Sequence, residues 1–252
     1  MKRKHKKVAS ENTANATPAH LPAKNNFNKP VYIIAFAFVI LISTFLVYAN
    51  SFGNDFLWDD IKFIIENPDI HSFSNLDKIF IHNHGYSSGA RNNFYRPMQS
   101  LFDIVNYHFG QGTPFLFHAT NVLLHAVCSI LLLCLFALIF NNGLVAFCAA
   151  LIFALHPVQT EAITYISGRA DPLYVFFGLL SILCFVLYDK QKNRFFCHIL
   201  SFVSLILSLL SKESAVIIPF LILLYVSAFN NSAESGKWKK YKAVFPYFII
   251  LL

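Results

Sequence analysis

Long apolar blocks separated by polar segments dominate this chain. The first block runs from Val31 to Ala49, nineteen residues without a charged side chain. A helix of that length spans the hydrocarbon core of a bilayer, roughly 30 Å, at about 1.5 Å per residue. Further apolar blocks follow at about 115–140, 144–165, 172–188, 195–210, 214–229 and from 243 onward. We therefore predict an all-α polytopic membrane protein with six full spans and the start of a seventh.

The polar segment 51–113 is too long and too patterned to be a plain connection between two spans. It contains two sets of apolar residues at helical spacing, namely Leu57, Trp58, Ile61, Ile64 and Ile65, and then Met98, Leu101, Phe102 and Val105. Asn67-Pro68 ends the first stretch, and Pro97 opens the second. Amphipathic helices of this kind lie in the plane of a membrane surface. We expect such interfacial helices in this first outer loop.

The distribution of charged residues predicts an orientation for the spans. If the N-terminus lies inside, the inner segments hold 14 Lys and Arg against 3 acids, and the outer segments hold 6 against 10. This asymmetry predicts a cytoplasmic N-terminus, with residues 1–30 forming a disordered basic tail. The net charge of +7 therefore does not indicate a nucleic-acid partner, because the lysines cluster where a membrane protein needs them. The chain stops about ten residues into an apolar block, so we expect 31–252 to be the N-terminal part of a larger transmembrane domain.

Asp59 and Asp60 directly follow the first span and are the first candidates for chemistry. Carboxylates suit general-base work on a hydroxyl group, and two neighbouring acids can have their pKa values pushed apart by their surroundings. The alternative is structural, since one of them can cap a helix that begins near Ile61. Spacing alone leaves both interpretations open.

His118, Asn121 and His125 stand at i, i+3 and i+7, so they share one face of the second span. Polar groups within a span face the bundle interior or a wet cavity. Hydrogen bonds between helices and a functional site explain the pattern equally well. A metal site would need a carboxylate close to these histidines, which the sequence alone does not show, and we predict no metal.

Three further groups of ionisable residues fall at the predicted outer ends of spans. They are His156 with Glu161, then Arg169 with Asp171, and finally Lys212 with Glu213. Pro157 is expected to kink the third span, and Asp171 before Pro172 is expected to cap the fourth. Lys212 can also simply snorkel to the interface. Together with Arg96, these residues supply cations for an anion such as a phosphate, and carboxylates for a base.

These motifs together resemble the transmembrane half of the TPR-containing protein O-mannosyltransferases and their bacterial relatives, a branch of the GT-C glycosyltransferases. The resemblance rests on Phe56-Leu57-Trp58-Asp59-Asp60, Asn67-Pro68, Tyr95-Arg96-Pro97, His118-Ala119-Thr120-Asn121 with Leu124-His125, Leu155-His156-Pro157 through Glu161 to Gly168-Arg169-Ala170-Asp171, and Leu210-Ser211-Lys212-Glu213. It runs from about Phe36 to Leu224. The relatives continue into further spans and tetratricopeptide repeats, and no 34-residue helical repeat is present here.

The resemblance implies a GT-C-like helical bundle and a membrane glycosyltransferase. Its sugar, mannose in the first instance, would pass from a polyprenyl-phosphate donor to Ser or Thr hydroxyls of an acceptor protein on the outer or lumenal face. Asp59 or Asp60 would be the base, and cations would replace the metal of soluble glycosyltransferases. The membrane would be the bacterial inner membrane, or the endoplasmic reticulum in a eukaryote. The competing interpretation is a non-catalytic membrane scaffold of a TPR-type protein.

Overall fold

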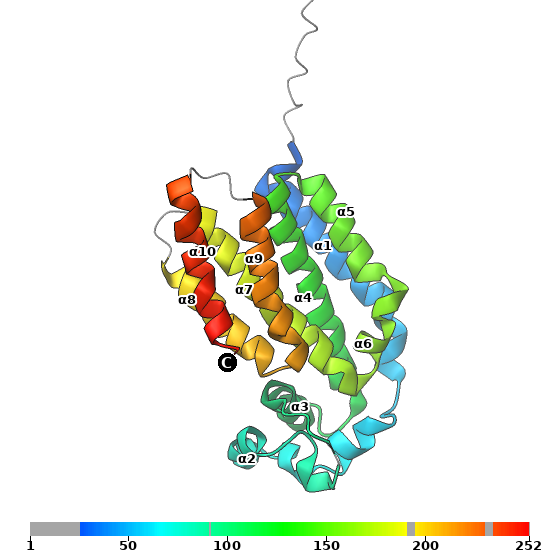
Figure 1. Cartoon of the computed structure of the whole chain (residues 1–252). Coiled ribbons are helices and arrows are strands. Elements are labelled where there is room, and N and C mark those ends of the chain that lie inside the picture. Colours follow the sequence, from blue (N-terminus) through cyan, green and yellow to red (C-terminus); the bar gives the residue numbers. More distant parts are fainter. Residues whose placement is uncertain (1–25, 91, 191–194, 230–233, 252) are drawn as a thin grey trace, which may run out of the picture.

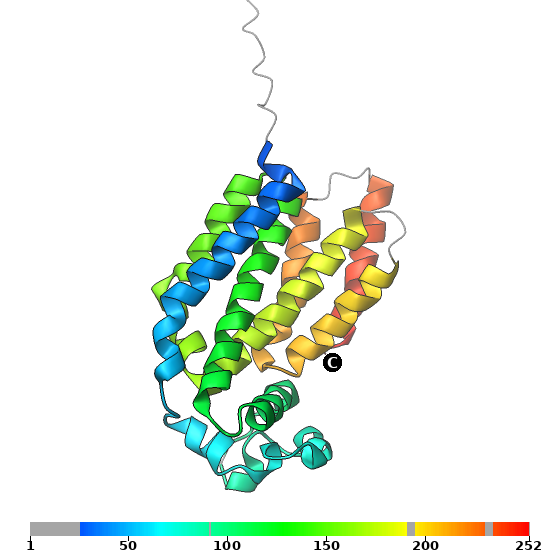
Figure 2. The ribbon, with the colours of Figure 1, turned by 180° about the vertical axis from the view of Figure 1, so that it is seen from behind.

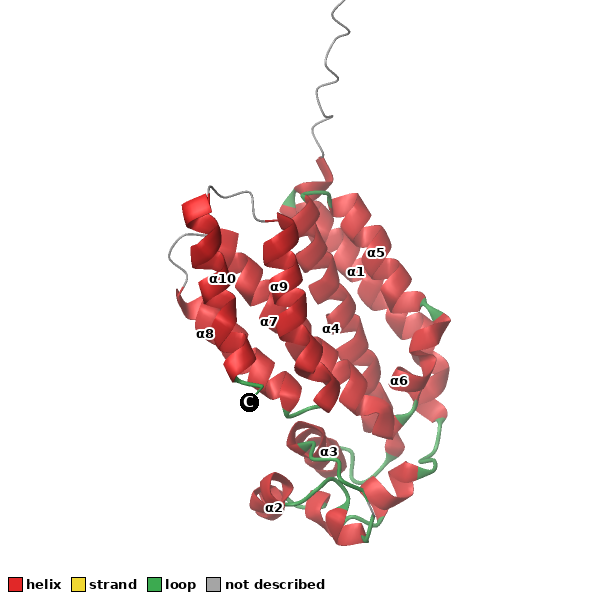
Figure 3. Ribbon diagram, viewed as in Figure 1, coloured by secondary structure: helices red, strands yellow, loops and turns green. Residues whose placement is uncertain are grey.

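The computed structural model describes residues 26–90, 92–190, 195–229 and 234–251. Within these ranges every regular element is helical. The long helices form a bundle, and a smaller group of short helices lies against one of its ends (Figures 1 and 3). The prediction of an all-α membrane protein is confirmed by this arrangement. The predicted N-terminal tail falls largely outside the described residues.

The bundle contains α1 (Pro30–Tyr48), α4 (Pro114–Phe140), α5 (Gly143–Leu155), α6 (Thr160–Thr164), α7 (Ala170–Lys190), α8 (Phe195–Leu209), α9 (Ile218–Phe229) and α10 (Glu234–Ile249). The group at its end, which we call the loop end, contains α2 (Leu76–Ile81) and α3 (Pro97–Phe109). The chain enters the bundle at the opposite end and alternates in direction from one long helix to the next (Figures 1 and 2). The segments that follow α1, α5 and α8 therefore meet at the loop end.

Helix length tests the predicted spans only in part. Three helical segments are long and apolar enough to cross a membrane: Pro30–Gly53, Pro114–Phe140 and Ile166–Lys190. The pair Gly143–Leu155 and Pro157–Thr164 adds a fourth if it forms one span, and it is bent by 48° where Pro157 was expected to kink it. The apolar helices Phe195–Leu209 and Glu213–Phe229 are shorter. The count of six spans and part of a seventh stays a prediction.

One local expectation is wrong. Asp171 does not cap α7, because the chain enters this helix through a 3-10 turn at Ile166–Arg169 and Asp171 lies inside its first turn. The stretch near Ile61 is helical as expected, but it is short: a single π-helical turn, Ile61–Ile65, forms before Asn67-Pro68 redirects the chain. Proline at the first turn does open α1, α3 and α4, in keeping with its missing N–H.

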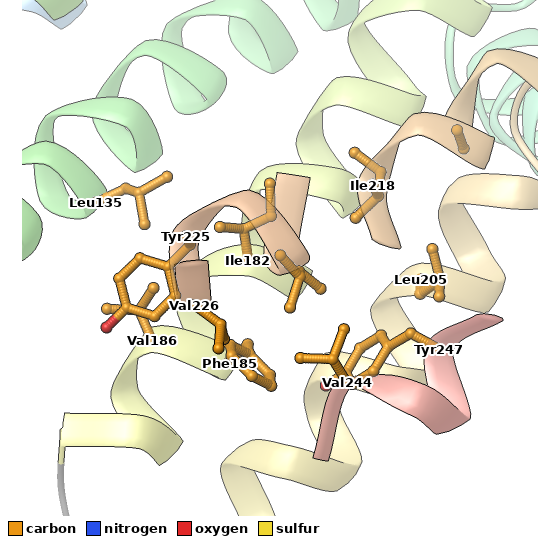
Figure 4. Packing of buried hydrophobic residues seen from close by; sticks show 12 residues of the cluster. Leu135, Ile182, Phe185, Val186, Leu205, Ile218, Tyr225, Val226, Val244 and Tyr247 are labelled. Carbon is orange, nitrogen blue, oxygen red and sulfur yellow. The ribbon is translucent and has the colours of Figure 1, made fainter. Parts of the chain in front are cut away.

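The largest apolar core lies between α7, α8, α9 and α10. Phe185 and Tyr247 stand edge to face with ring centroids 5.7 Å apart, and Leu205, Val226 and Val244 belong to the same cluster (Figure 4). Apolar burial of this kind fixes how the four helices lie beside one another.

Small and hydroxyl side chains let the helices of this core approach closely. The hydroxyl groups of Ser181 on α7 and Ser201 on α8 each donate to the other's backbone oxygen, at 2.8 and 2.7 Å. A Cβ atom at Gly178 would lie 2.6 Å from Cδ1 of Ile218. Small residues and interhelical hydrogen bonds of this kind are typical of helix packing in membranes.

The loop end has its own small core. Ile64, Ile70, Ile79 and Ile104 are buried there together with Phe117 of α4. The loop is therefore a packed unit attached to the bundle rather than a loose connection, and it can hold side chains in fixed positions next to the helix ends.

Candidate active site

A cleft of about 350 Å³ lies between the outer loop and the turns that join α5 to α7. Three acidic residues, Asp59, Glu161 and Asp171, line it together with Arg96. Phe63, Phe94 and Tyr165 supply aromatic walls. Four of the residues singled out in the sequence therefore share one cavity although they are up to 112 positions apart in the chain.

Two ion pairs connect Lys212 and Glu213 to the same cleft. Arg96 donates from Nη2 to Oε1 of Glu213 at 2.7 Å and from Nε to Oε2 at 3.3 Å. Lys212 donates from Nζ to Oδ1 of Asp171 at 2.6 Å. Two ion pairs thus hold the segment between α8 and α9 at the cleft. The ion pair with Lys212 also explains what Asp171 does in place of capping α7.

The two adjacent aspartates have different environments. Asp60 is 1% exposed, and its carboxylate accepts hydrogen bonds from the backbone N–H groups of Leu57 at 3.0 Å and Ser167 at 2.8 Å, and from the Ser167 hydroxyl. Asp59 is exposed and lines the cleft, and its side chain accepts no hydrogen bond from the residues that the structure describes. The backbone N–H of Asp59 donates to the Tyr165 hydroxyl at 3.2 Å. Asp60 joins two segments, whereas Asp59 has a free carboxylate.

The residue before the two aspartates, Trp58, has a strained backbone conformation. Trp58 has φ +48°, in the left-handed region, and its side chain is 83% exposed. A bulky residue there is uncommon and costs on the order of 1–3 kcal/mol. The hydrogen bonds of Asp60 hold this tight turn, which directs Asp60 inward and leaves Asp59 at the cleft.

Arg169 is fully buried and makes an ion pair inside the protein. It donates from Nη1 to Oδ1 of Asp103 at 2.8 Å, from Nε to Oδ1 of Asn121 at 2.7 Å, and from Nη2 to the backbone oxygen of Phe117 at 2.9 Å. These partners leave its guanidinium group no exposed surface for a ligand. Its role at a donor phosphate stays a prediction, which in this arrangement would require the loop to move away from Arg169.

The three polar residues on α4 all face the interior. The side-chain amide of Asn121 donates to the backbone oxygens of Ile163 and Tyr165 at 3.3 and 3.2 Å, and Nε2 of His125 lies 3.1 Å from the backbone oxygen of Ala154. His118 is 2% exposed. Asn121 and His125 therefore make hydrogen bonds between helices, as one of the two interpretations expected.

His156 is not brought into the cleft. Its ring is exposed, and Nδ1 accepts a hydrogen bond from the backbone N–H of Val158 at 3.1 Å. This hydrogen bond caps the short turn Pro157–Gln159.

Among the described residues, no group of three or more His, Cys, Asp or Glu side chains lies close enough together to hold a metal ion.

His84 and Asp103 are among the buried ionisable residues that the sequence motifs did not single out. Nδ1 of His84 lies 2.8 Å from the Ser100 hydroxyl, and its Nε2 lies 3.9 Å from Oδ2 of Asp103. Burial, assisted by Arg96 and Arg169, lowers the pKa of His84 to about 3. A signal for Asp103 was present, because Gln99, Asp103 and Asn106 are polar residues at helical spacing on α3.

A family model described as "Dolichyl-phosphate-mannose-protein mannosyltransferase" matches residues 88–252. The chain is 37% identical over 152 residues to "Protein O-mannosyl-transferase tmtc2" of Xenopus laevis, an alignment that covers 59% of this chain and 18% of that protein. It is 32% identical over 169 residues to "Protein O-mannosyl-transferase TMTC4" of Homo sapiens, covering 60% of this chain and 23% of that protein.

A third relative, "Protein O-mannosyl-transferase F38B6.6" of Caenorhabditis elegans, is 33% identical over 193 residues, which cover 73% of this chain and 27% of that protein. The chain thus spans between 18% and 27% of the length of these three relatives. No solved structure matches the chain.

Proposed function

Because the chain belongs to the dolichyl-phosphate-mannose-protein mannosyltransferase family, we propose that it is part of the membrane region of a glycosyltransferase. This enzyme transfers a sugar, mannose in the first instance, from a polyprenyl-phosphate donor to Ser or Thr hydroxyls of proteins. The observation that carries the proposal is the cleft, in which a free carboxylate, that of Asp59, faces the same cavity as Arg96. The chain covers only part of its relatives, so the activity is proposed for the complete protein.

Asp59 is the general base in this proposal. Its carboxylate is exposed to the cleft, whereas that of Asp60 is occupied by three hydrogen bonds. A base must reach the proton that it removes, and an occupied, buried carboxylate does not. Asp60 is a positioning residue, because it holds the turn from which Asp59 projects.

Arg96 and Lys212 hold the phosphate of the sugar donor. Each of them already binds a carboxylate, Glu213 and Asp171 respectively. An arriving phosphate would exchange with these carboxylates, since arginine binds phosphate and carboxylate with the same planar fork. The side chain of Arg96 is 12% exposed and that of Lys212 is 22% exposed, so both are partly desolvated and their charges are only partly screened.

The polyprenyl chain lies in a second cavity, of about 260 Å³, next to the cleft. His125, Cys128 and Phe153 line this cavity, and it shares Ala162 and Asp171 with the cleft. A polar cleft that continues into a more apolar cavity between helices fits a ligand with a charged head and an apolar tail.

The reaction balances with these groups alone. The oxygen of the acceptor hydroxyl attacks the anomeric carbon of the sugar, and the bond from that carbon to the phosphate oxygen breaks. The hydroxyl proton passes to the carboxylate of Asp59. The polyprenyl phosphate leaves with the additional negative charge, which Arg96 and Lys212 stabilise.

The loop end faces away from the cytoplasm in this proposal, which places the cleft on the lumenal or periplasmic side. The support is the charge asymmetry of the segments, 14 basic residues against 3 acids at the end where α1 begins. Acceptor proteins would reach the cleft from that side.

Transfer of labelled mannose tests the proposal. Membranes that contain the complete protein receive a polyprenyl-phosphate mannose and an acceptor peptide rich in Ser and Thr. Asp59→Asn should abolish transfer, while Asp55→Asn, an exposed acid in the same loop that does not line the cleft, should keep it. Mannose transfer by the Asp59→Asn variant would refute the assignment of Asp59 as the general base. A correctly inserted wild-type protein that transfers no mannose would favour the scaffold interpretation.

A further inference from the structure

A groove of about 540 Å³ lies at the end of the bundle opposite the cleft. It is lined by Ile33 and Ile34 near the start of α1, by Cys134, Ala137 and Leu138 near the end of α4, and by Lys190 at the end of α7. Helix α4 packs against both α1 and α7, and it runs between them as seen in Figure 2. The groove therefore has α4 as its floor and the two other helices as its walls.

The groove is open toward the surroundings of the bundle and apolar along most of its length. Ile34 is 69% exposed, on a helix that is long and apolar enough to cross a membrane. Side chains at this position contact lipid rather than water in a protein that spans a bilayer. The groove is thus shaped to hold an extended apolar chain.

One end of the groove is polar and positively charged. Lys190 is exposed and its ammonium group donates to the backbone oxygen of Leu138. Asn28 and Asn141 lie beside it, and they bond to each other at 2.6 and 2.8 Å. The groove is lined by no carboxylate from the described parts of the chain. The nearest acid in sequence, Asp189, accepts a hydrogen bond from Tyr225 on α9.

We propose that this groove binds one anionic phospholipid of the leaflet in which α1 begins. The phosphate lies at the ammonium group of Lys190 and the side-chain N–H groups of Asn141, which Asn28 holds in place, and one acyl chain lies along Ile33, Ile34 and the α4 floor. The positive charge of Lys190 complements the phosphate, and the apolar length of the groove fits an acyl chain, which is why we propose this occupant. Basic pockets between membrane helices on the cytoplasmic side are known to hold lipid head groups.

This lipid site is separate from the sugar-donor cleft, which lies at the other end of the same helices. The occupant bridges α1 and α7 over α4, so it stabilises the end of the bundle at which α1 enters. The proposal requires only that the chain spans a membrane, and it stands whether or not Asp59 is a base.

Tryptophan fluorescence quenched by brominated lipids tests the site. The reporter is Ile34→Trp in the full chain, with the native Trp58 and Trp238 changed to Phe. A matched reporter is Leu46→Trp, on the same helix, 72% exposed and outside the groove. Both are reconstituted in vesicles of phosphatidylcholine in which a rising fraction is replaced by brominated phosphatidylglycerol or, separately, brominated phosphatidylcholine.

The Ile34→Trp reporter should show about fivefold preference for phosphatidylglycerol, which corresponds to about 1 kcal/mol for one lysine. The Leu46→Trp reporter should show no preference. Lys190→Gln should remove the preference, and Lys29→Gln, the same loss of charge on an exposed neighbour outside the groove, should keep it.

Two outcomes would overturn the proposal. Equal quenching by both lipids at Ile34→Trp would mean that any phospholipid fills the groove without recognition of its head group. Quenching at Leu46→Trp but not at Ile34→Trp would mean that a protein segment or a second copy of the chain covers the groove.

Discussion

The guanidinium group of Arg169 donates to the carboxylate of Asp103 at 2.8 Å, and the two side chains are 0% and 2% exposed. This ion pair joins the turn before α7 to helix α3 of the outer loop, 66 positions away in the chain. Burial raises the pKa of Asp103 to about 7, against the opposite effect of Arg169. The attachment of the loop to the bundle therefore depends on two buried charges that need each other.

Replacing Arg169 by Met should destabilise the protein by about 3–5 kcal/mol, because it leaves the Asp103 carboxylate buried without its partner. Thermal unfolding in detergent micelles measures the loss. Lys62→Gln is the matched control, since it breaks an exposed ion pair with Glu66 and should cost less than about 1 kcal/mol.

The double variant Arg169→Met with Asp103→Leu separates the charge from the packing. It should recover a large part of the lost stability, because neither buried charge remains unpaired. If Arg169→Met alone were as stable as the wild type, the ion pair between Arg169 and Asp103 would not hold the loop to the bundle.

Asp60→Asn should lower stability by about 1–3 kcal/mol, whereas Asp59→Asn should change it by less than about 0.5 kcal/mol. The amide cannot accept all three hydrogen bonds that the Asp60 carboxylate accepts, and its NH₂ group would face backbone donors. The same unfolding assay checks both variants. Equal losses for the two would contradict the separate roles assigned to these aspartates.

His84 predicts a dependence of stability on pH. Its pKa is lowered to about 3 in the fold, so between pH 6.5 and 3 the unfolded state takes up a proton that the folded state does not, and stability falls as the pH falls. At pH 5 the loss is about 2 kcal/mol relative to pH 7. Asp103, whose pKa is raised, acts in the opposite sense over this range.

The contrast between the wild type and His84→Asn isolates the histidine from Asp103. On going from pH 7 to pH 5, the variant should gain about 2 kcal/mol relative to the wild type. Denaturation of both chains at the two pH values measures this difference. Parallel pH profiles would mean that His84 takes up a proton in the folded state or is accessible there.

The sequence predicted the features that depend on local pattern. Apolar length located the long helices, and proline predicted the start of α3 and the bend of 48° after Leu155. The motifs also identified the residues that meet at the cleft, among them Asp59, Arg96 and Asp171. Alternation of the spans was enough to place these on one side of the bundle.

The sequence could not show which polar groups pair across the fold. Arg169 looked free for a phosphate because its partner Asp103 is 66 positions away and lies on a helix read only for its apolar face. Asp171 looked like a helix cap because Pro172 follows it, but the preceding 3-10 turn and Lys212 change its role. Such pairs are set by tertiary contacts, which no local spacing encodes.

Membrane topology gives a further prediction. Cysteine replacements at Ser87 in the outer loop and at Lys192, which lies outside the described residues, should label with an impermeant thiol reagent from opposite sides of sealed vesicles. The charge asymmetry is the physical reason. The unsubstituted chain gives the background of its five native cysteines. Labelling of both positions from one side would end the proposed topology.

The cations of the cleft should govern use of the sugar donor in the complete enzyme. Removing a charged hydrogen bond to an anion costs on the order of 2–3 kcal/mol, a loss of roughly 30- to 150-fold in kcat/KM for the polyprenyl-phosphate sugar. Arg96→Gln and Lys212→Gln should each show this loss in kcat/KM for the sugar donor, while the KM for the acceptor stays unchanged. Arg96→Lys should restore only part of the lost kcat/KM, because a point charge does not reproduce the planar fork of arginine.

Arg169→Lys should instead lower thermal stability, since the guanidinium group of Arg169 bonds to Asp103, Asn121 and Phe117 inside the protein. If Arg169→Lys keeps its stability but loses donor use while Arg96→Gln does not, the phosphate contact belongs to Arg169 after a rearrangement of the loop.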